Sequence, residues 1–566
     1  MMRLVTLTSA LIVSALAVGP VHSETIKLAG VAMIAGVLAL RMRANSQRTE
    51  AWLLTGVVAS TWLASVVALE PMTSVLGTLD RAQGALAALG LGVLALSAAD
   101  LRAEQRYRFY VATAAVGGLI GLYAVLQRLG LDPWAWVDTV PGRPAATLSN
   151  AVVVGGYLTL CLPLSIWLLL SAISAPTINR VACMLLAIAT ASQLGGLIAS
   201  GTRSAMLALF ITGTVLLLRR GRLRVWLLPT LLLAGLVIAW SASHRLDSLG
   251  DRAQLWASAT RALQSSLPLR DLKGSADAMH AWRGIIGFGP DLQQIPLRTA
   301  RSDSALVRAQ AAELQADRAH QWLLDRLLEA GWLGLMSSLA FAGFVAWRLR
   351  EAIVDVDVAI RAEALALAIA LGAFALHLQV NFALTGDRTL AWILIGCVLG
   401  LPRRGLSASA PLRAQPIALF AIQVGIAAVL FAGAVAIGGG VRGLNPAMDA
   451  EREFLAGQQR YVAAMADSSQ AAAQSFAQSA QYFEAAGRLR RFDTDAALAA
   501  ASAWIEAAQS AMDPKPLESA RYWLSAARAI DPREPRLKPI DARLQAVTLA
   551  IATIAEQSST GVRDGG

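Results

Sequence analysis

The sequence has little charge for its length. Of its 566 residues, 15% are charged and 56% are hydrophobic, and the mean hydropathy is +0.53. A soluble chain of this size needs more polar surface to cover its hydrophobic cores. The shortage of charge therefore excludes an ordinary soluble protein and favours a membrane protein.

Cysteine is scarce as well. The three cysteines, Cys161, Cys183 and Cys397, all lie within apolar stretches and lack the spacing of a metal site. This placement excludes a disulfide framework and gives no indication of redox chemistry. We predict neither a metal nor another cofactor.

Lysine occurs only at positions 27, 273, 515 and 538, so the net charge of +11 comes almost entirely from arginine. Such a charge could indicate a nucleic-acid partner. Here, however, the basic residues cluster at the ends of apolar segments, which is the orientation signal of a membrane protein. We therefore expect no nucleic acid as a partner. The predicted cytoplasmic clusters are Arg41 to Arg48, Arg102 to Arg108, Arg219 to Arg224, and Arg403 with Arg404.

Several apolar stretches reach the roughly 17–25 residues that a helix needs to cross a bilayer. Clear cases are 51–69, 109–126, 151–171 and 416–438. Helices satisfy their own backbone groups in lipid, and a barrel would show alternating polarity instead. The predicted fold class is thus all-α: a polytopic membrane protein of about 12–13 transmembrane helices. Residues 3–20 could be a cleaved signal peptide or a first helix, and we favour the helix.

The charge alternation also divides the chain. Residues 1–130 are predicted as N-terminal transmembrane helices, and 131–402 as a membrane core with a large periplasmic loop at 243–319. Residues 403–439 hold the last transmembrane helix, and 440–566 form a soluble helical domain in the periplasm. A loop this long is uncommon where the other connections are short, which suggests that it has a function. It contains or borders His244, His280 and His320.

The C-terminal region is rich in alanine and helix-forming residues. Two of its stretches resemble each other, Trp504 to Pro514 and Trp523 to Pro532, and each ends in Asp-Pro. They indicate a degenerate helical-hairpin repeat of the tetratricopeptide type, which could bind a protein partner. An alanine-rich helical bundle without a partner is the alternative.

Charged residues on the predicted outer face are candidates for chemistry, because orientation does not require them there. Arg203 follows a turn between two apolar runs, where it could snorkel to the interface or anchor an anion such as a phosphate. Arg252, at the start of the outer loop, is one arginine among several. The glycine-rich segment Arg283 to Pro290 lacks the features of a phosphate-binding loop, so we interpret it as a structural turn.

His320 lies where the outer loop re-enters the membrane. A single histidine is more often structural than catalytic, yet one at this boundary could act as a general base near neutral pH. No clustered ligand set accompanies it, so a metal site is not expected.

The order of these motifs resembles that of the O-antigen ligase and polymerase superfamily. The resemblance covers about residues 130–400 and departs from the family at Gln321, where the family usually has asparagine after the histidine. Its motifs are Gly142 to Asn150, Gly201 to Ser204, Arg252 to Trp256, Gly284 to Pro290, Ala319 with His320, and Gly331 to Gly334.

The resemblance implies a metal-independent membrane glycosyltransferase that uses a glycan carried on undecaprenyl diphosphate. It implies that Arg203 and Arg252 hold the diphosphate and that His320 takes the proton of the acceptor hydroxyl. The substrate-binding residues that it implies are Arg143, Asn150, Arg283, Arg318 and Gln321.

Several functions stay open within this resemblance. A ligase would transfer the glycan to an acceptor such as the lipid A core, a polymerase would join repeat units, and a third enzyme would glycosylate protein. A flippase for lipid-linked sugars belongs to a different class, and a membrane scaffold for the C-terminal helices would have no catalytic role. The expected location is the bacterial inner membrane, with the active site and the C-terminal domain in the periplasm.

Overall fold

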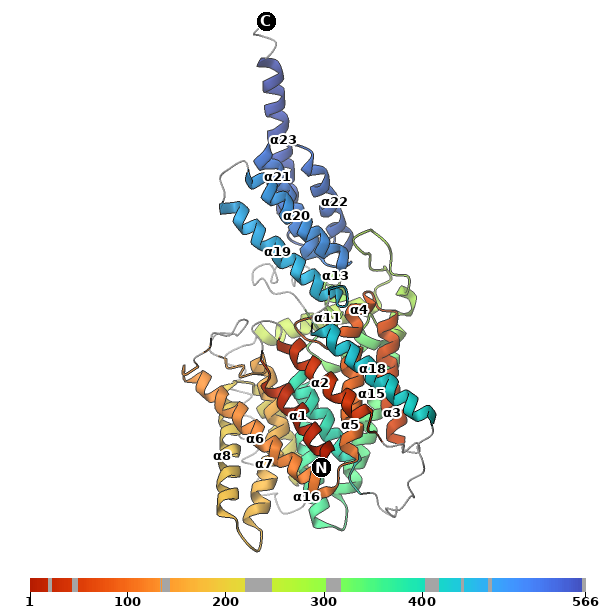
Figure 1. The fold of residues 1–566 in the computed structure, drawn as a ribbon, viewed down its shortest axis with the longest axis vertical. Helices are drawn as coiled ribbons and strands as arrows, with labels where there is room; N and C mark the ends of the chain where they lie inside the picture. The colour runs from red at the N-terminus through yellow and green to blue at the C-terminus, as the bar shows by residue number, and fades with distance from the viewer. Residues whose placement is uncertain are drawn as a thin grey trace.

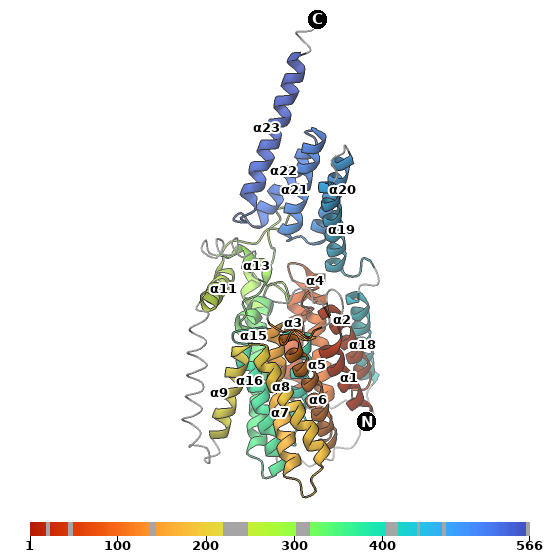
Figure 2. The same ribbon diagram turned by 90° about the vertical axis from the view of Figure 1, so that its left-hand side faces the viewer.

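The computed structural model describes residues 1–18, 23–42, 49–132, 134, 143–218, 247–301, 317–402, 417–438, 442–466 and 471–561. Within these ranges the chain is helical, and its only β-type pairing is an isolated bridge between Arg270 and Ala276. Apolar helices form a bundle, and the C-terminal helices project from one end of it (Figures 1 and 2). The all-α fold class is therefore confirmed. The predicted span at 224–242, His244, and the clusters at Arg219 to Arg224 and at Arg403 with Arg404 lie outside the described residues.

Six described helices are long and apolar enough to cross a membrane. They are α6 (Ala103–Arg128), α7 (Ala151–Ile173), α8 (Arg180–Ala199), α15 (Trp322–Ile353), α16 (Val358–His377) and α18 (Ile417–Ile437). Shorter apolar helices pack with them: α1 (Met2–Leu16), α2 (Ser23–Ala39), α3 (Thr49–Val66), α5 (Ala85–Ala99), α9 (Arg203–Leu218) and α17 (Thr385–Leu399).

Helix α1 packs one face against the rest of the bundle. Leu7, Ala10 and Leu11 are fully buried, and the hydroxyl of Thr147 donates to the carbonyl of Ala15 across 2.6 Å. Residues 2–16 thus form a helix that packs against the rest of the bundle.

Basic side chains tie together one end of the bundle, called here the basic end. Arg3 pairs with Asp100 at 2.6 Å and donates to the carbonyl of Arg41 at 2.7 Å. Arg106 pairs with Glu363 at 2.6 Å, which joins α6 to α16. The described parts of the predicted cytoplasmic clusters therefore meet at the same end.

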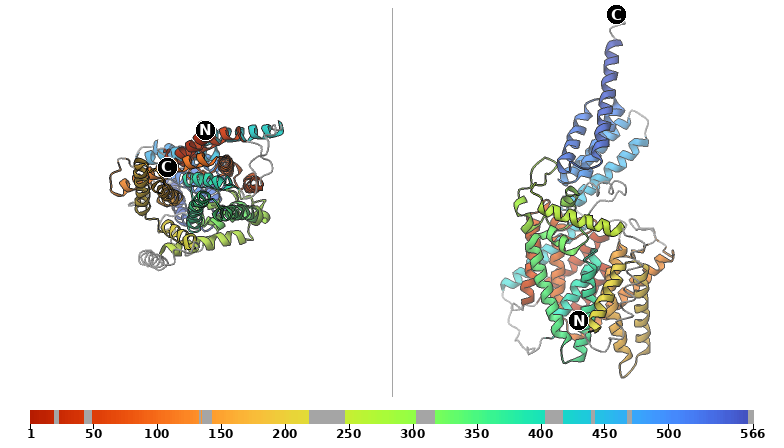
Figure 3. Two further views of the ribbon diagram at one scale, coloured as in Figure 1. Left: turned by 90° about the horizontal axis from the view of Figure 1, so that it is seen from below. Right: turned by 180° about the vertical axis from the view of Figure 1, so that it is seen from behind.

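The opposite end, called here the loop end, carries short helices outside the bundle. These are α4 (Pro71–Leu76), α11 (Asp247–Gln264), η2 (His280–Trp282), α12 (Arg283–Ile286) and α13 (Gln294–Thr299). Helix α11 lies across the end of the bundle when the molecule is seen from behind (Figure 3). A hydrophobic cluster that includes Ala259, Phe288, Leu297 and Leu328 joins these helices to the start of α15.

Two of the glycine motifs meet where α15 is kinked. Gly331 has φ +61°, so it breaks the helical hydrogen bonding, and a Cβ atom there would collide with the carbonyl oxygen of Ile285. The N–H groups of Phe288 and Gly289 donate to the carbonyls of Leu328 and Glu329 at 2.7 and 3.0 Å. The segment Arg283 to Pro290 is a turn that satisfies carbonyls released by this kink.

The C-terminal helices pack on one another in sequence. They are α19 (Pro446–Ala466), α20 (Ala471–Leu489), α21 (Thr494–Ala511), α22 (Pro516–Ile530) and α23 (Leu537–Gly561). The two similar sequence segments lie in α21 and α22. The indole N–H groups of Trp504 and Trp523 both donate to Oε1 of Glu484, at 2.7 and 2.8 Å. One carboxylate thus holds the corresponding tryptophans of both segments.

The C-terminal helices are anchored to the loop end by buried contacts. Arg301 pairs with Asp531 at 3.0 Å and Glu534 at 3.5 Å, and all three side chains are largely buried. The turn between α20 and α21 inserts Phe492 into the hydrophobic cluster of the loop end, and its N–H donates to Glu70 at 3.3 Å. The C-terminal helices and the loop end therefore share an interface that has a buried hydrophobic core.

Candidate functional site

A half-open cavity of about 1630 Å³ lies among α3, α9, α15, α16 and α17, and it is called here the membrane cavity. Apolar side chains line most of its length, including Val215, Phe341, Val345, Leu371 and Trp392. Its dimensions and walls suit a long apolar ligand.

One end of the membrane cavity is polar. Charged and amide side chains gather there at the loop end: Gln83, Arg318, Asp325, Arg326, Glu329, Gln379, Asn381 and Arg388. Part of this charge is matched internally. Arg326 lies 3.5 Å from Glu329, and Asp325 accepts hydrogen bonds from the backbone N–H groups of Ala319 and Gln321.

Arg318 is a buried cation of this end that keeps unused hydrogen-bond donors. Its side chain is 4% exposed, its Nη1 donates weakly to Gln83 at 3.4 Å, and its Nε and Nη2 have no hydrogen-bond partner among the described residues. The nearest carboxylate oxygen, on Asp317, is 4.0 Å from Nε, which is beyond hydrogen-bond reach. A buried guanidinium with unused donors is unfavourable unless a ligand completes it. An anionic ligand at this end of the cavity would do so.

His320 lies beside this polar end. Its Nε2 is 3.3 Å from Oδ1 of Asp317, and its ring packs edge-on against Phe382 at 5.2 Å. Phe382 lines the membrane cavity. The guanidinium of Arg318 packs over the ring of Phe382, 5.1 Å from its centroid. His320 itself has φ +53°, a strained conformation for a non-glycine residue that often occurs at functional sites.

Asp317 is the carboxylate that contacts the imidazole of His320. Burial alone would raise its pKa, but the hydrogen bond to His320 and the charges of Arg81 and Arg318 lower the pKa well below its usual range. Arg81 forms an ion pair with the same carboxylate. An ionised Asp317 would orient the ring of His320 and stabilise its protonated form, which is the role of the carboxylate in a catalytic dyad.

The structure links Arg252 through one asparagine to Ser204, the residue that follows Arg203. Arg252 donates to Oδ1 of Asn381 at 3.1 Å, and Nδ2 of Asn381 donates to the hydroxyl of Ser204 at 2.6 Å. Arg203, the preceding residue, begins α9 and is half-buried. Burial lowers the pKa of Arg252, as expected for a cation taken from water. Asn381 and its neighbour Phe382 line the membrane cavity, whereas neither Arg203 nor Arg252 is among its lining residues.

The other predicted substrate-binding residues make structural contacts. Arg143 donates to the carbonyl of Ser200 at 3.3 Å, and Asn150 caps α7 by accepting from Val152 at 2.8 Å. Gln321 caps α15 by accepting from Leu324 at 2.6 Å, and its amide also donates to Gln379.

Arg283 is fully engaged. It forms a two-pronged pair with Asp277, with both distances 2.8 Å, and its Nη1 donates to the carbonyls of Val67 and Gly287 at 2.9 Å. In this arrangement Arg283 fixes the glycine turn, and its place is outside the membrane cavity.

Several residues of the polar end escaped the sequence analysis: Gln83, Arg326, Glu329, Asn381 and Arg388. A signal for them was present, because ionisable residues within apolar segments are costly and often functional. Arg326 and Glu329 are three residues apart on α15, but the others are distant in sequence, and only the tertiary packing assembles the whole set.

Among the described residues, no group of three or more His, Cys, Asp or Glu side chains is placed to hold a metal ion. Comparison with protein-family models gives no match for the chain. Comparison with curated proteins gives no match either.

Proposed function

We propose that the protein is a membrane glycosyltransferase that moves a glycan from undecaprenyl diphosphate onto an acceptor hydroxyl in the periplasm. In this proposal the loop end faces the periplasm and the basic end faces the cytoplasm, as the distribution of arginine favours. A ligase acting on the lipid A core is the leading form. A polymerase of repeat units and a protein glycosyltransferase are its variants.

The observation that carries the proposal is the position of Arg318. Its unused Nε and Nη2 lie at the polar end of a long apolar cavity. A polyprenyl diphosphate has the matching form, with an apolar tail and an anionic head. The tail would lie along the apolar walls, and the diphosphate would accept hydrogen bonds from Arg318, with Arg326 and Arg388 adding positive charge.

The chemistry follows from the neighbouring groups. The acceptor oxygen attacks the anomeric carbon of the donor sugar, and the bond from that carbon to the diphosphate oxygen breaks. The proton of the acceptor hydroxyl passes to His320, which Asp317 orients, and the bonding electrons leave with the polyprenyl diphosphate. Arg318 stabilises the leaving group most strongly as its charge develops.

The proposal is tested by deleting the gene and restoring it as wild type, His320→Ala or Arg318→Ala. Surface glycans and lipid-linked intermediates are then compared on gels, with protein levels checked. Bare core with accumulated long lipid-linked chains indicates a ligase, and core bearing one repeat indicates a polymerase. Unchanged glycan profiles for both variants at normal protein level would contradict an enzymatic function.

A flippase for the same lipid-linked glycan is a second candidate, and one observation favours it. The membrane cavity is also lined by Arg350 and Arg361, which lie towards the basic end of α15 and α16. A path with cations at both ends could pass an anionic headgroup. Transport would not need a proton acceptor, so His320→Ala would leave a flippase active while Arg350→Ala would impair it.

A further inference from the structure

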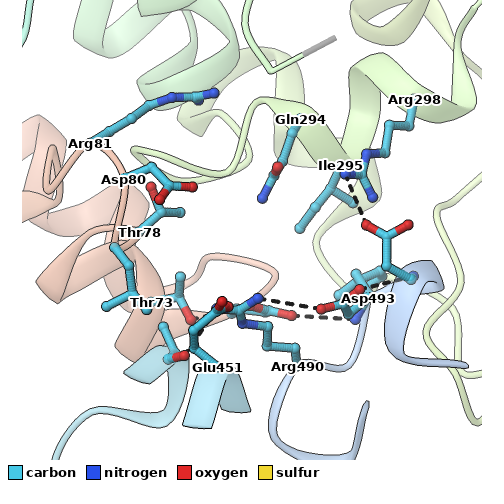
Figure 4. A pocket seen from close by; sticks show the side chains of 15 residues that line it. Thr73, Thr78, Asp80, Arg81, Gln294, Ile295, Arg298, Glu451, Arg490 and Asp493 are labelled. Atoms are coloured by element: carbon cyan, nitrogen blue, oxygen red, sulfur yellow. Dashed lines mark hydrogen bonds and ion pairs between the residues drawn. The ribbon is translucent and has the colours of Figure 1, made fainter. Parts of the chain in front are cut away.

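A second cavity, of about 240 Å³, lies where the C-terminal helices meet the loop end, and it is called here the junction cleft. Three parts of the chain form it. The first is the segment from Glu70 to Arg81, the second is α13, and the third is the start of α19 together with the turn from Arg490 to Asp495. Their side chains surround a common space in Figure 4. The C-terminal region thus supplies one wall of this cavity.

The side chain of Arg81 connects the junction cleft to the proposed catalytic pair, Asp317 and His320. Arg81 lines the cleft, and its guanidinium is paired with Asp317, whose other oxygen is 3.3 Å from Nε2 of His320. Two residues further along the chain, Gln83 lines the membrane cavity. The turn from Thr78 to Gln83 therefore separates the two cavities, with His320 beside it.

This separating turn is rigidly held. Oδ2 of Asp291 accepts hydrogen bonds from the N–H and hydroxyl of Thr78, at 2.6 and 2.8 Å, and from the N–H of Gln83 at 3.1 Å. Asp291 is 1% exposed. A buried carboxylate with three donors fixes the relative position of the two cavities.

The chemistry of the junction cleft indicates its ligand. Its lining holds five carboxylates and three guanidiniums, those of Arg81, Arg298 and Arg490. Arg490 lies 3.4 Å from both Glu451 and Asp493, so the wall presents donors and acceptors side by side. A sugar hydroxyl donates one hydrogen bond and accepts others, and it therefore suits such a surface. The excess of carboxylates disfavours a phosphate-bearing ligand.

We propose that the junction cleft binds the acceptor as a neutral, hydroxyl-rich glycan, and that the C-terminal helices act as part of the acceptor site. The inference rests on the proposed glycosyl transfer. In this arrangement the donor occupies the membrane cavity, the acceptor occupies the junction cleft, and His320 lies between them. The acceptor hydroxyl then reaches His320 past the Arg81 and Asp317 pair.

The first experiment measures binding to the purified full-length protein by saturation-transfer NMR. The neutral probe is N,N′-diacetylchitobiose, and the anionic probe is glucose 6-phosphate. We expect saturation transfer to the neutral sugar and about tenfold less saturation transfer to glucose 6-phosphate, because the carboxylates of the cleft repel its phosphate group. Glu451→Trp, which fills the cleft, should abolish the signal, while the matched surface change Glu518→Trp should keep it. No transfer to the neutral sugar, equal transfer to both probes, or a signal that survives Glu451→Trp overturns the proposal.

The second experiment separates this inference from the proposed function. Cells that carry Glu451→Trp, His320→Ala or Glu518→Trp are compared for lipid-linked glycan, with thermal melting of each purified variant as a check on folding. We expect lipid-linked glycan to accumulate in the Glu451→Trp and His320→Ala strains. If His320→Ala accumulates the donor and a folded Glu451→Trp does not, the acceptor site lies elsewhere. If His320→Ala changes nothing, the glycosyl transfer itself is refuted.

Discussion

Arg318 and His320 contact the same phenylalanine. The guanidinium carbon of Arg318 is 5.1 Å from the centroid of the Phe382 ring, and the imidazole centroid of His320 is 5.2 Å from it. Phe382 belongs to the connection between α16 and α17, whereas the other two residues precede α15. The contact places a buried cation and a potential proton acceptor on either side of one wall residue of the membrane cavity.

Arg318→Ala should weaken donor binding, because it removes the guanidinium that faces the polar end of the cavity. Hydrogen bonds to charged groups contribute roughly 1.5–3 kcal/mol, so affinity for undecaprenyl diphosphate should fall about 10- to 100-fold. Arg318→Lys should recover part of it, since an ammonium keeps the charge but cannot form the paired contact. Native mass spectrometry of the purified protein with this lipid measures the effect. Arg283→Lys is the control, because Arg283 is already paired with Asp277. Equal affinity for wild type and Arg318→Ala would show that the diphosphate binds elsewhere.

Asp317→Asn should lower transfer by about 10²–10⁴-fold, because the imidazole loses the anion that orients it. The pKa of Asp317 lies well below its usual range, so this carboxylate stays ionised from mildly acidic to alkaline pH. Its contribution to stability is present above the unfolded-state pKa and is lost only as the pH falls through the lower folded-state pKa. Asp317 itself therefore does not titrate between about pH 5 and 9, and the loss of activity should be present throughout this range. A defect confined to one end of this range in a pH-rate profile would contradict the assigned role.

Gly331→Ala should destabilise the protein by more than about 1–3 kcal/mol, since the residue has φ +61° and its Cβ would collide with the carbonyl of Ile285. The kink positions Arg326 and Glu329 at the polar end, so activity should fall as well. Gly343→Ala, on the same helix but with open space around it, is the matched control and should leave stability unchanged or slightly raised. Thermal melting in detergent compares the two. Similar melting temperatures would mean that the kink tolerates a side chain.

Arg301→Ala should loosen the C-terminal helices from the loop end. It leaves Asp531 and Glu534 buried without their cation, and breaking such a pair costs about 3–5 kcal/mol. Hydrogen exchange of α22 should then become faster. Arg528→Ala removes a solvent-exposed partner of Asp541 and should have little effect on exchange. Unchanged exchange in Arg301→Ala would contradict an anchored interface.

The general architecture could be predicted from the sequence because it follows from local patterns. Long apolar runs predict the membrane-spanning helices, and basic clusters predict which helix ends lie together. The alanine-rich periodicity predicts the C-terminal helices. The expected boundaries differ from the observed ones by a few residues, as for 151–171 against Ala151–Ile173. Side-chain identity is sufficient for such features, since each depends on neighbours along the chain.

The candidate site could be predicted only in part. His320 stood out as a histidine at the predicted membrane boundary, whereas Arg318 was implied by the family resemblance. Arg283 was implied by the same resemblance, yet its pair with Asp277 uses its donors, and local sequence patterns do not show that pairing. Arg388 and Gln83 are more than 300 residues apart and meet only through the packing of α5 and α17. Contacts of this range depend on the tertiary fold, so local patterns do not show them.

The central claim is that the membrane cavity presents a polyprenyl-diphosphate donor to His320, and one measurement tests it most directly. Purified full-length protein is incubated with labelled lipid-linked glycan and acceptor, and free undecaprenyl diphosphate is quantified. The wild type should release one diphosphate lipid for each glycan transferred, and His320→Ala and Arg318→Ala should each release at least about 100-fold less. Release by His320→Ala at the wild-type rate, or no release by the folded wild type, would contradict the account.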